Sequence, residues 1–182
     1  MRMQAYHGTD LECAEKILTG QFSFYPNDEH WLGNGVYFFL DYSLAEWWTT
    51  NPSSTFGSRV KIPSIIQVAI ELPPLHNMLD LRKLSDYKEF CELYFDEYLP
   101  LVQQEVFDIS EINLKKMRCS FCDYLKYTYD LKAIIGNFSS TRQRYLAKEH
   151  QRLHKVLELY YMETQLCVFD LACIHDKHII KL

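Results

Sequence analysis

Three short segments carry the side chains of this 182-residue chain that could do chemistry. Residues 6–9 read YHGT, residues 31–38 read WLGNGVYF, and residues 163–170 read ETQLCVFD. A histidine, a tyrosine and a glutamate set among glycines can hydrogen-bond a flat, charged ligand, stack on it and stabilise its charge. Each residue type also has an ordinary structural use. A histidine can end a strand, glycines permit a turn, a tyrosine fills a core, and a glutamate can be a solvated charge at a strand edge. Taken one at a time, the segments do not predict an activity.

The patterns that mark the common catalytic and cofactor sites are missing from the sequence. Gly33 and Gly35 supply the first two glycines of a dinucleotide-binding fingerprint, but Phe38 stands in the place of the third. There is no Walker loop, no G-x-S-x-G nucleophile elbow and no H-E-x-x-H zinc motif. Cys119 and Cys122 form a C-x-x-C pair, and no second pair exists to complete a zinc site. We therefore expect free thiols and no bound metal.

Composition and charge indicate a folded protein that does not wrap a polyanion. Apolar residues make up 48% of the chain and the net charge is −5, which argues against binding nucleic acid over the whole surface. Residues 80–111 hold nine acidic and three basic residues, and residues 115–155 hold ten basic and three acidic residues. These segments form either two charged faces of an insertion or helix surfaces that neutralise one another. With no signal-peptide core and no apolar run of roughly 18 residues, we expect a cytoplasmic protein that does not enter a membrane.

Strands and helices must position the three segments, and both ends of the chain contain candidates. Capping-box spacing at Thr9–Glu12 predicts a helix that stops at Gly20, and the same spacing at Ser43–Glu46 predicts a helix carrying Trp47 and Trp48. Short apolar runs predict strands at residues 36–40, 64–72, 165–171 and 178–182.

The middle of the chain, from about residue 81 to residue 162, reads as mainly helical. Breaks are expected near Pro100 and at Gly136-Asn137, and residues 144–160 predict a helix with one apolar and one basic side. Strands at both ends around a helical middle predict an α+β fold. We expect a single domain over residues 1–182, with a mainly helical insertion at about 81–162.

In their order along the chain, the three segments resemble the signature of the ADP-ribosyltransferase superfamily, in the branch of the poly(ADP-ribose) polymerases and diphtheria toxin. That signature is an H-G-T or H-G-S strand, a G-x-G-[IV]-Y-F segment with a second aromatic about ten residues on, and a late strand that opens with the catalytic acid. The matches are residues 7–9, residues 33–38 with Trp47, and the strand of Glu163. The resemblance covers residues 4–48 and 163–182 and implies an α+β core built on a split antiparallel sheet with a helical insertion.

The resemblance implies an enzyme that uses NAD as its substrate, releases nicotinamide and transfers one ADP-ribose unit to a protein or nucleic acid, without a metal. Cleavage of the glycosidic bond passes through an oxocarbenium-like state, as in glycoside hydrolysis. By analogy, His7 bonds a ribose hydroxyl and the Gly8 backbone holds the carboxamide, where the missing Cβ permits close approach. Tyr37 and Trp47 would sandwich the nicotinamide ring, and Thr9 and Gly35 complete the NAD-binding set. The small size resembles bacterial toxins and phage-defence effectors, which implies an antitoxin or inhibitor protein as a partner.

The catalytic acid is where the chain departs from the family signature. Alignment on the VFD ending puts Gln165 at the usual glutamate position, with Glu163 two residues earlier on the same strand face, roughly 7 Å away. A neutral amide can hydrogen-bond a ribose hydroxyl, but it cannot oppose positive charge or deprotonate an acceptor. We therefore predict a catalytic set of Glu163, Gln165, His7 and Tyr37, in which Glu163 supplies the charge.

Two other functions stay open at this point. The chain could be a catalytically silent module of the same fold that binds NAD, ADP-ribose or a partner protein. It could also be a different enzyme of that fold, an NAD glycohydrolase or an RNA 2′-phosphotransferase.

Overall fold

A computed structural model describes residues 1–51, 60–72, 77–105, 113–139 and 162–182 of the chain. The strands are β1 (Arg2–Asp10), β2 (Val36–Phe39), β3 (Pro63–Glu71), β4 (Met78–Asp80), β5 (Ala133–Ser139), β6 (Met162–Val168) and β7 (Ile174–Lys181). The helices are α1 (Leu11–Thr19), α2 (Tyr42–Thr50), α3 (Leu84–Glu92), α4 (Leu99–Glu105) and α5 (Leu114–Thr128), with a π-helical segment at Leu93–Tyr98 and a 3-10 turn at Leu171–Cys173. The strands form one mixed sheet in the order β4-β5-β6-β2-β1-β3-β7, so the expected α+β class is confirmed.

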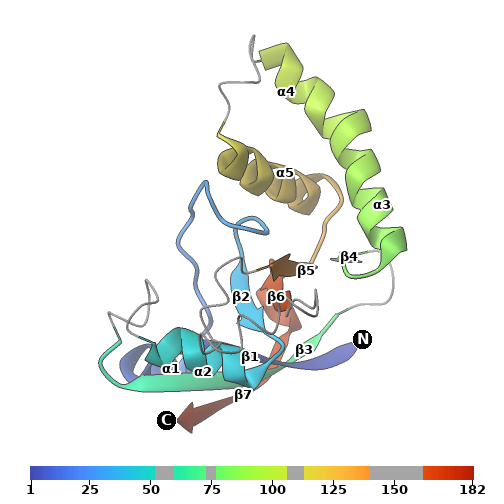
Figure 1. The fold of residues 1–182 in the computed structure, drawn as a ribbon. Coiled ribbons are helices and arrows are strands. Elements are labelled where there is room, and N and C mark those ends of the chain that lie inside the picture. Colours follow the sequence, from blue (N-terminus) through green and yellow to red (C-terminus); the bar gives the residue numbers. More distant parts are fainter. Residues whose placement is uncertain (52–59, 73–76, 106–112, 140–161) are drawn as a thin grey trace, which may run out of the picture.

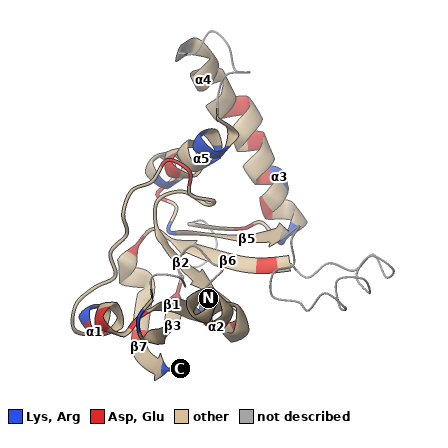
Figure 2. Cartoon of the chain, turned by 60° about the vertical axis from the view of Figure 1, so that its left-hand side comes forward, with Lys and Arg blue, Asp and Glu red and all other residues tan. Residues whose placement is uncertain are grey.

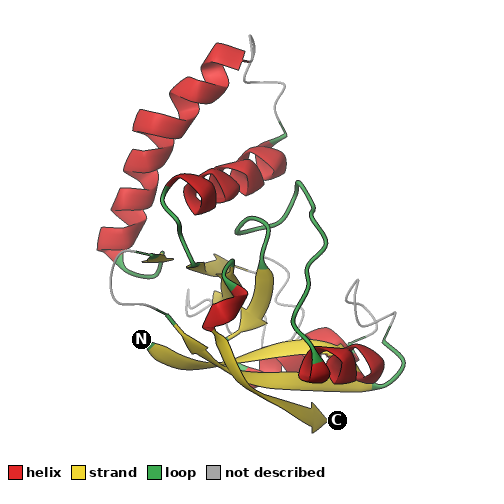
Figure 3. Ribbon diagram, turned by 180° about the vertical axis from the view of Figure 1, so that it is seen from behind, coloured by secondary structure: helices red, strands yellow, loops and turns green. Residues whose placement is uncertain are grey.

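The sheet is split between β2 and β1. Strands β1 and β3 pair along their whole length, as do β5 and β6, whereas β1 and β2 share the single registered pair Tyr6↔Phe39. All neighbouring strands are antiparallel except β4 and β5. Figure 3 shows the strands of the two parts running in clearly different directions on either side of this junction. Beyond Tyr6, therefore, β1 and β2 diverge at the segments that the sequence analysis singled out.

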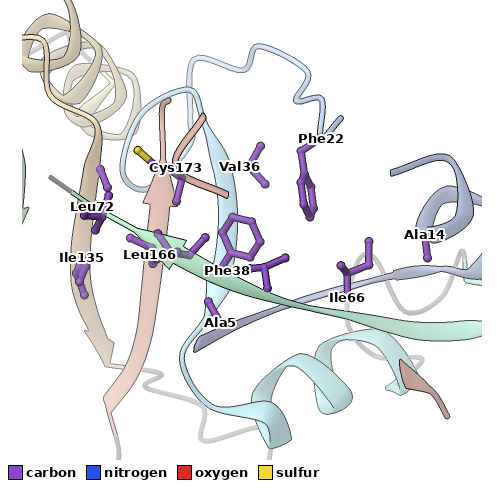
Figure 4. Packing of buried hydrophobic residues seen from close by; sticks show 14 residues of the cluster. Ala5, Ala14, Phe22, Val36, Phe38, Ile66, Leu72, Ile135, Leu166 and Cys173 are labelled. Carbon is purple, nitrogen blue, oxygen red and sulfur yellow. The ribbon is translucent and has the colours of Figure 1, made fainter. Parts of the chain in front are cut away.

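Two apolar clusters hold the fold together. The first joins both parts of the sheet and includes Ala5 of β1, Phe38 of β2, Ile66 of β3 and Leu166 of β6, with Ala14 and Phe22 covering it (Figure 4). The second lies between β4–β6 and the helices, and it includes Leu79, Tyr98, Phe121, Cys122, Leu125 and Ile134. Helix α5 therefore packs on one end of the sheet, next to the β2–β6 pair (Figure 1).

Aspartates, rather than the predicted threonine and serine, cap the first two helices. The Asp10 side chain accepts a hydrogen bond from Glu12 N–H at the start of α1, and the Asp41 side chain accepts one from Ser43 N–H at the start of α2. An aspartate carboxylate at these positions satisfies an exposed N–H of the first turn as well as a hydroxyl does. Thr9 consequently stays in β1, and α1 ends at Gly20 as predicted.

The middle of the chain contains more sheet than the sequence predicted. Gly136 and Asn137 do not break a helix but pair with Gln165 and Thr164 inside β5 and β6. Pro100 does not end the long helix either, because the preceding π-helical segment, in which Leu99 N–H bonds the Tyr94 carbonyl, accommodates the proline and its missing N–H. The described helical part covers Leu84–Glu105 and Leu114–Thr128, and the helix predicted at 144–160 lies outside the described residues.

The uneven charge of the sequence is distributed over two helical elements. Figure 2 shows acidic residues along the helix that contains α3 and basic residues on α5. Two of these cations form ion pairs with the loop before β2. Lys115 Nζ lies 3.3 Å from Glu29 Oε2, and Lys116 Nζ lies 2.5 Å from Asp28 Oδ2. None of the helices in the described ranges is long and apolar enough to cross a membrane.

Candidate functional site

The three segments lie on three adjacent strands, although His7 and Gln165 are 158 positions apart in the sequence. The segment of His7 is in β1, that of Tyr37 in β2 and that of Gln165 in β6, and β2 lies between the other two. The registered pairs Tyr6↔Phe39 and Phe39↔Gln165 put all three segments at the point where the sheet splits.

His7 bridges the two parts of the sheet just beyond the last β1–β2 pair. Its Nδ1 lies 2.8 Å from the Tyr37 carbonyl oxygen, and because a carbonyl can only accept, Nδ1 carries the proton. The ring packs edge-on against Phe22 and Phe38, at centroid distances of 5.3 and 5.8 Å. Burial lowers the pKa of His7, although the hydrogen bond to Tyr37 opposes this shift. The neutral ring consequently leaves Nε2 as a hydrogen-bond acceptor, the state suited to a ligand hydroxyl.

Gly8 is required by the packing of α2 on β1. A Cβ at this position would lie 2.0 Å from Thr49 Oγ1 and 2.8 Å from the Ala45 carbonyl oxygen. The missing Cβ thus makes room for helix α2, a structural reason for this glycine that the sequence analysis did not identify. Nothing in this packing bears on whether the Gly8 backbone binds a carboxamide, so that role stays a prediction.

Tyr37 uses its hydroxyl to hold the loop that precedes β2. The hydroxyl accepts the Leu32 N–H at 2.7 Å and donates to the Gly33 carbonyl at 2.9 Å. Burial raises its pKa well above the usual value, so Tyr37 is neutral at every physiological pH. The half-buried ring lies 5.5 Å from that of His30. Tyr37 is therefore held by its hydroxyl in one orientation, as a stacking ring requires.

The two smaller predicted contacts, Gly35 and Thr9, are largely enclosed by protein. A Cβ on Gly35 would lie 2.6 Å from the Val168 carbonyl and 2.7 Å from Cys167 Sγ, so the loop packs directly on the end of β6. Thr9 is only 4% exposed and pairs with Ser64 of β3. Both residues support neighbouring strands, and their contact with NAD stays a prediction.

Helix α2 carries both tryptophans, as the sequence predicted. The Trp48 ring lies 6.3 Å from that of Phe39, the residue that pairs with Gln165. Trp47 is half-buried one position along the helix. The described ring contact thus places Trp48 at the centre of the three strands, while the stacking role of Trp47 stays a prediction.

Gln165 and Glu163 differ in how the sheet encloses them. Gln165 lies between Phe39 of β2 and Gly136 of β5, whereas Glu163 pairs with Phe138 of β5 beyond the end of β2. Both side chains are half-buried and, with one residue between them in the strand, they point to the same face. Among the described strands, Glu163 therefore has a neighbour on β5 only, whereas Gln165 has neighbours on both β2 and β5.

Sequence reasoning missed the contribution of α5 to the G-x-G loop. Asp123 accepts two hydrogen bonds from Asn34, one from the backbone N–H at 2.7 Å and one from Nδ2 at 2.6 Å. Lys126 Nζ donates to the Asn34 carbonyl at 3.2 Å. The loop that the Tyr37 hydroxyl holds is thus also held by α5, through a hydrogen bond between residues 89 positions apart. Helical spacing of Asp123 and Lys126 was visible in the sequence, but nothing in it identified the partner.

The cysteines near the site are thiols. Cys122 and Cys167 are fully buried, and desolvation raises the pKa of both above the ordinary value for a thiol. Among the described residues there is no group of histidine, cysteine, aspartate and glutamate side chains that could hold a metal ion.

Comparison with known proteins gives a relative but no function. No protein-family model matches the chain. The chain is similar to the uncharacterized protein MJ0359 of Methanocaldococcus jannaschii, with 29% identity over 124 residues. This similarity covers 67% of the present chain and 52% of the archaeal protein, so the chain matches about half the length of that relative.

Proposed function

We propose that the chain is an NAD-dependent mono-ADP-ribosyltransferase. One observation carries the proposal: the three segments that resemble the family signature lie on the adjacent strands β1, β2 and β6, where the sheet splits. A split antiparallel sheet is also what the resemblance implied. Three weak motifs that merely occurred by chance in one chain would have no reason to meet at one place in the fold.

The reaction follows from the residues around this place. The bond between the ribose anomeric carbon and the nicotinamide nitrogen breaks, and nicotinamide leaves as a neutral molecule with the bonding electron pair. A heteroatom of the acceptor forms the new bond to the same carbon, and its proton passes to a base and then to water. His7 Nε2, an unprotonated acceptor, would take a hydrogen bond from a ribose hydroxyl, and the Tyr37 ring would stack on the pyridinium.

Glu163 is the carboxylate for this reaction in our proposal. It would stabilise the positive charge that develops on the ribose and take the acceptor proton, which an amide cannot do. Glu163 lies beyond the end of β2, where it would meet the acceptor, whereas Gln165 lies between two strands and would orient the ribose.

The test is incubation of the protein with NAD labelled in its adenylate part and with cell lysate, followed by protease or nuclease treatment. We expect free nicotinamide and label on a macromolecule, with one ADP-ribose unit at each modified site. Glu163→Gln should lose at least about a hundredfold in transfer rate, in the range of general-base loss, and far more than Gln165→Ala does. Gln165→Glu should be tolerated or should speed nicotinamide release. If Gln165→Ala is the more damaging change, the assignment of the carboxylate is wrong.

The amide at position 165 favours a second candidate, a catalytically silent module that binds NAD or ADP-ribose. The same assay separates the two, because the silent module would bind NAD without releasing nicotinamide. Nicotinamide release without macromolecular label would instead indicate an NAD glycohydrolase.

A further inference from the structure

Two buried nitrogen atoms without hydrogen-bond partners lie around one exposed tryptophan. Among the described residues, the buried side-chain atoms without a partner are His30 Nδ1 and Arg118 Nε. His30 precedes Trp31 in the chain, and the Arg118 guanidinium stacks on the Trp31 ring, 4.5 Å from its centroid. Buried polar atoms are almost always paired, so two unpaired nitrogen atoms so close together in the structure require an explanation.

Arg118 differs from Lys115 and Lys116 of the same helix, each of which pairs with a carboxylate. Lys115 and Lys116 pair with Glu29 and Asp28, and Lys126 donates to a backbone carbonyl. Within the part of the chain that the structure describes, the Arg118 guanidinium lies on the Trp31 ring, and its Nε has no hydrogen-bond partner. A guanidinium is always charged and offers paired N–H donors that match the oxygens of a phosphate.

Trp31 and Arg118 lie on the side of Glu163 that faces away from His7. The Trp31 ring packs on Phe138 at 4.7 Å, and Phe138 pairs with Glu163. In the strand order β5-β6-β2-β1, Phe138 and His7 are on opposite outer strands, with Glu163 between them. A donor nucleotide held by His7 and Tyr37 would lie over β1 and β2, which leaves the β5 side of Glu163 to a second molecule.

We propose that Trp31 and Arg118 form the subsite for a nucleic-acid acceptor, an inference that rests on the proposed function. Arg118 binds a phosphate of a single strand, and one base stacks against the ring of Trp31, a residue that is 49% exposed. A protein acceptor would satisfy the arginine through a carboxylate but would leave the exposed indole unused. The net charge of −5 restricts binding to this local contact instead of an extended basic surface.

Binding of a fluorescein-labelled single-stranded 12-mer, as DNA and as RNA of the same sequence, is measured by anisotropy in the absence of NAD. Arg118→Ala should weaken binding about tenfold and reduce the slope of log K against log salt by about 0.7, the value of one lost phosphate contact on a single strand. Trp31→Ala should weaken binding at least about fivefold, and Trp31→Phe should retain most of it. Lys116→Ala is the matched control, since it removes a charge from the same helix and should change binding less than threefold.

Other outcomes would overturn the subsite. Arg118→Ala and Lys116→Ala with equal effects would show that only net charge matters. Because Arg118→Ala also removes packing on Trp31, Arg118→Lys is measured beside it: the lysine keeps the charge but not the planar fork, and full binding by this variant would also contradict the proposal. A tenfold rise in the KM for NAD in Arg118→Ala, without a change in oligonucleotide binding, would assign the arginine to the donor.

The two proposals can fail separately. Oligonucleotide binding that depends on Arg118, in a protein that never releases nicotinamide, would retain the subsite and reject the transferase. Nicotinamide release with label on protein only, unaffected by Arg118→Ala, would retain the transferase and reject the subsite.

Discussion

Gly8→Ala inserts a methyl group where α2 lies directly on β1. The new Cβ would be 2.0 Å from Thr49 Oγ1 and 2.8 Å from the Ala45 carbonyl oxygen, both far inside van der Waals contact. The Thr49 side chain is 0% exposed, and its hydroxyl donates to the same carbonyl at 2.7 Å. Neither the hydroxyl nor the helix backbone can give way without losing a hydrogen bond or shifting α2.

The expected cost combines two effects. Overpacking a filled core typically costs about 1–3 kcal/mol, and displacing the buried Thr49 hydroxyl from its partner adds about 1 kcal/mol. A loss of about 3 kcal/mol lowers the Tm of a chain of this size by roughly 6–12 °C. Gly20→Ala is the matched control, because a Cβ there would meet only the Lys16 carbonyl at 3.1 Å, and it should cost less than about 1 kcal/mol.

Chemical denaturation of Gly8→Ala, Thr49→Ala and the double variant tests this reasoning as a cycle. Thr49→Ala removes the oxygen that the new methyl group would strike, so the double variant should be more stable than the sum of the single losses by about 1–2 kcal/mol. Additive losses, or a cost of Gly8→Ala no larger than that of Gly20→Ala, would refute the close packing of α2 on β1 and return Gly8 to a role in ligand approach alone.

Two further predictions concern the residues that meet at the split. Because burial lowers the pKa of His7, the native state keeps the ring neutral while the unfolded chain takes up a proton near pH 6.5, so the stability from His7 is complete above that pH and is lost as the pH falls below it. His7→Gln should therefore flatten the fall of the unfolding free energy between pH 7 and pH 5, and an unchanged profile would contradict the lowered pKa. Tyr37→Phe leaves Leu32 N–H without its partner and leaves the Gly33 carbonyl with the Cys167 thiol, at 3.8 Å. It should cost about 1–3 kcal/mol in denaturant unfolding, whereas Tyr25→Phe should cost less than about 0.5 kcal/mol because Tyr25 is 89% exposed. Equal losses in the two tyrosine variants would mean that the hydroxyl of Tyr37 does not hold the loop.

Much of the local structure was determined by the sequence alone. The run at residues 36–40 predicted β2 to within one residue, the run at 64–72 predicted β3 to within one, and the stop of α1 at Gly20 was correct. These elements follow from the pattern of apolar residues and from the glycine that ends a helix, and both signals act over a few residues. The caps were missed at Asp10 and Asp41, although an aspartate within two residues of each predicted cap was a signal in the sequence.

Only the tertiary structure decided how these elements meet. Residues 133–139 form a short apolar run that periodicity cannot assign to a strand or to a buried helix, and pairing with β6 makes it a strand. The split of the sheet likewise depends on which strand pairs with which, a property of contacts between distant residues. For the candidate site, the order of three short motifs and their resemblance to a family signature singled out His7, Tyr37 and Glu163. The hydrogen bond between Asp123 and Asn34 joins residues 89 positions apart, and the cation–π contact between Arg118 and Trp31 joins residues 87 positions apart. Both contacts form because α5 packs against the sheet.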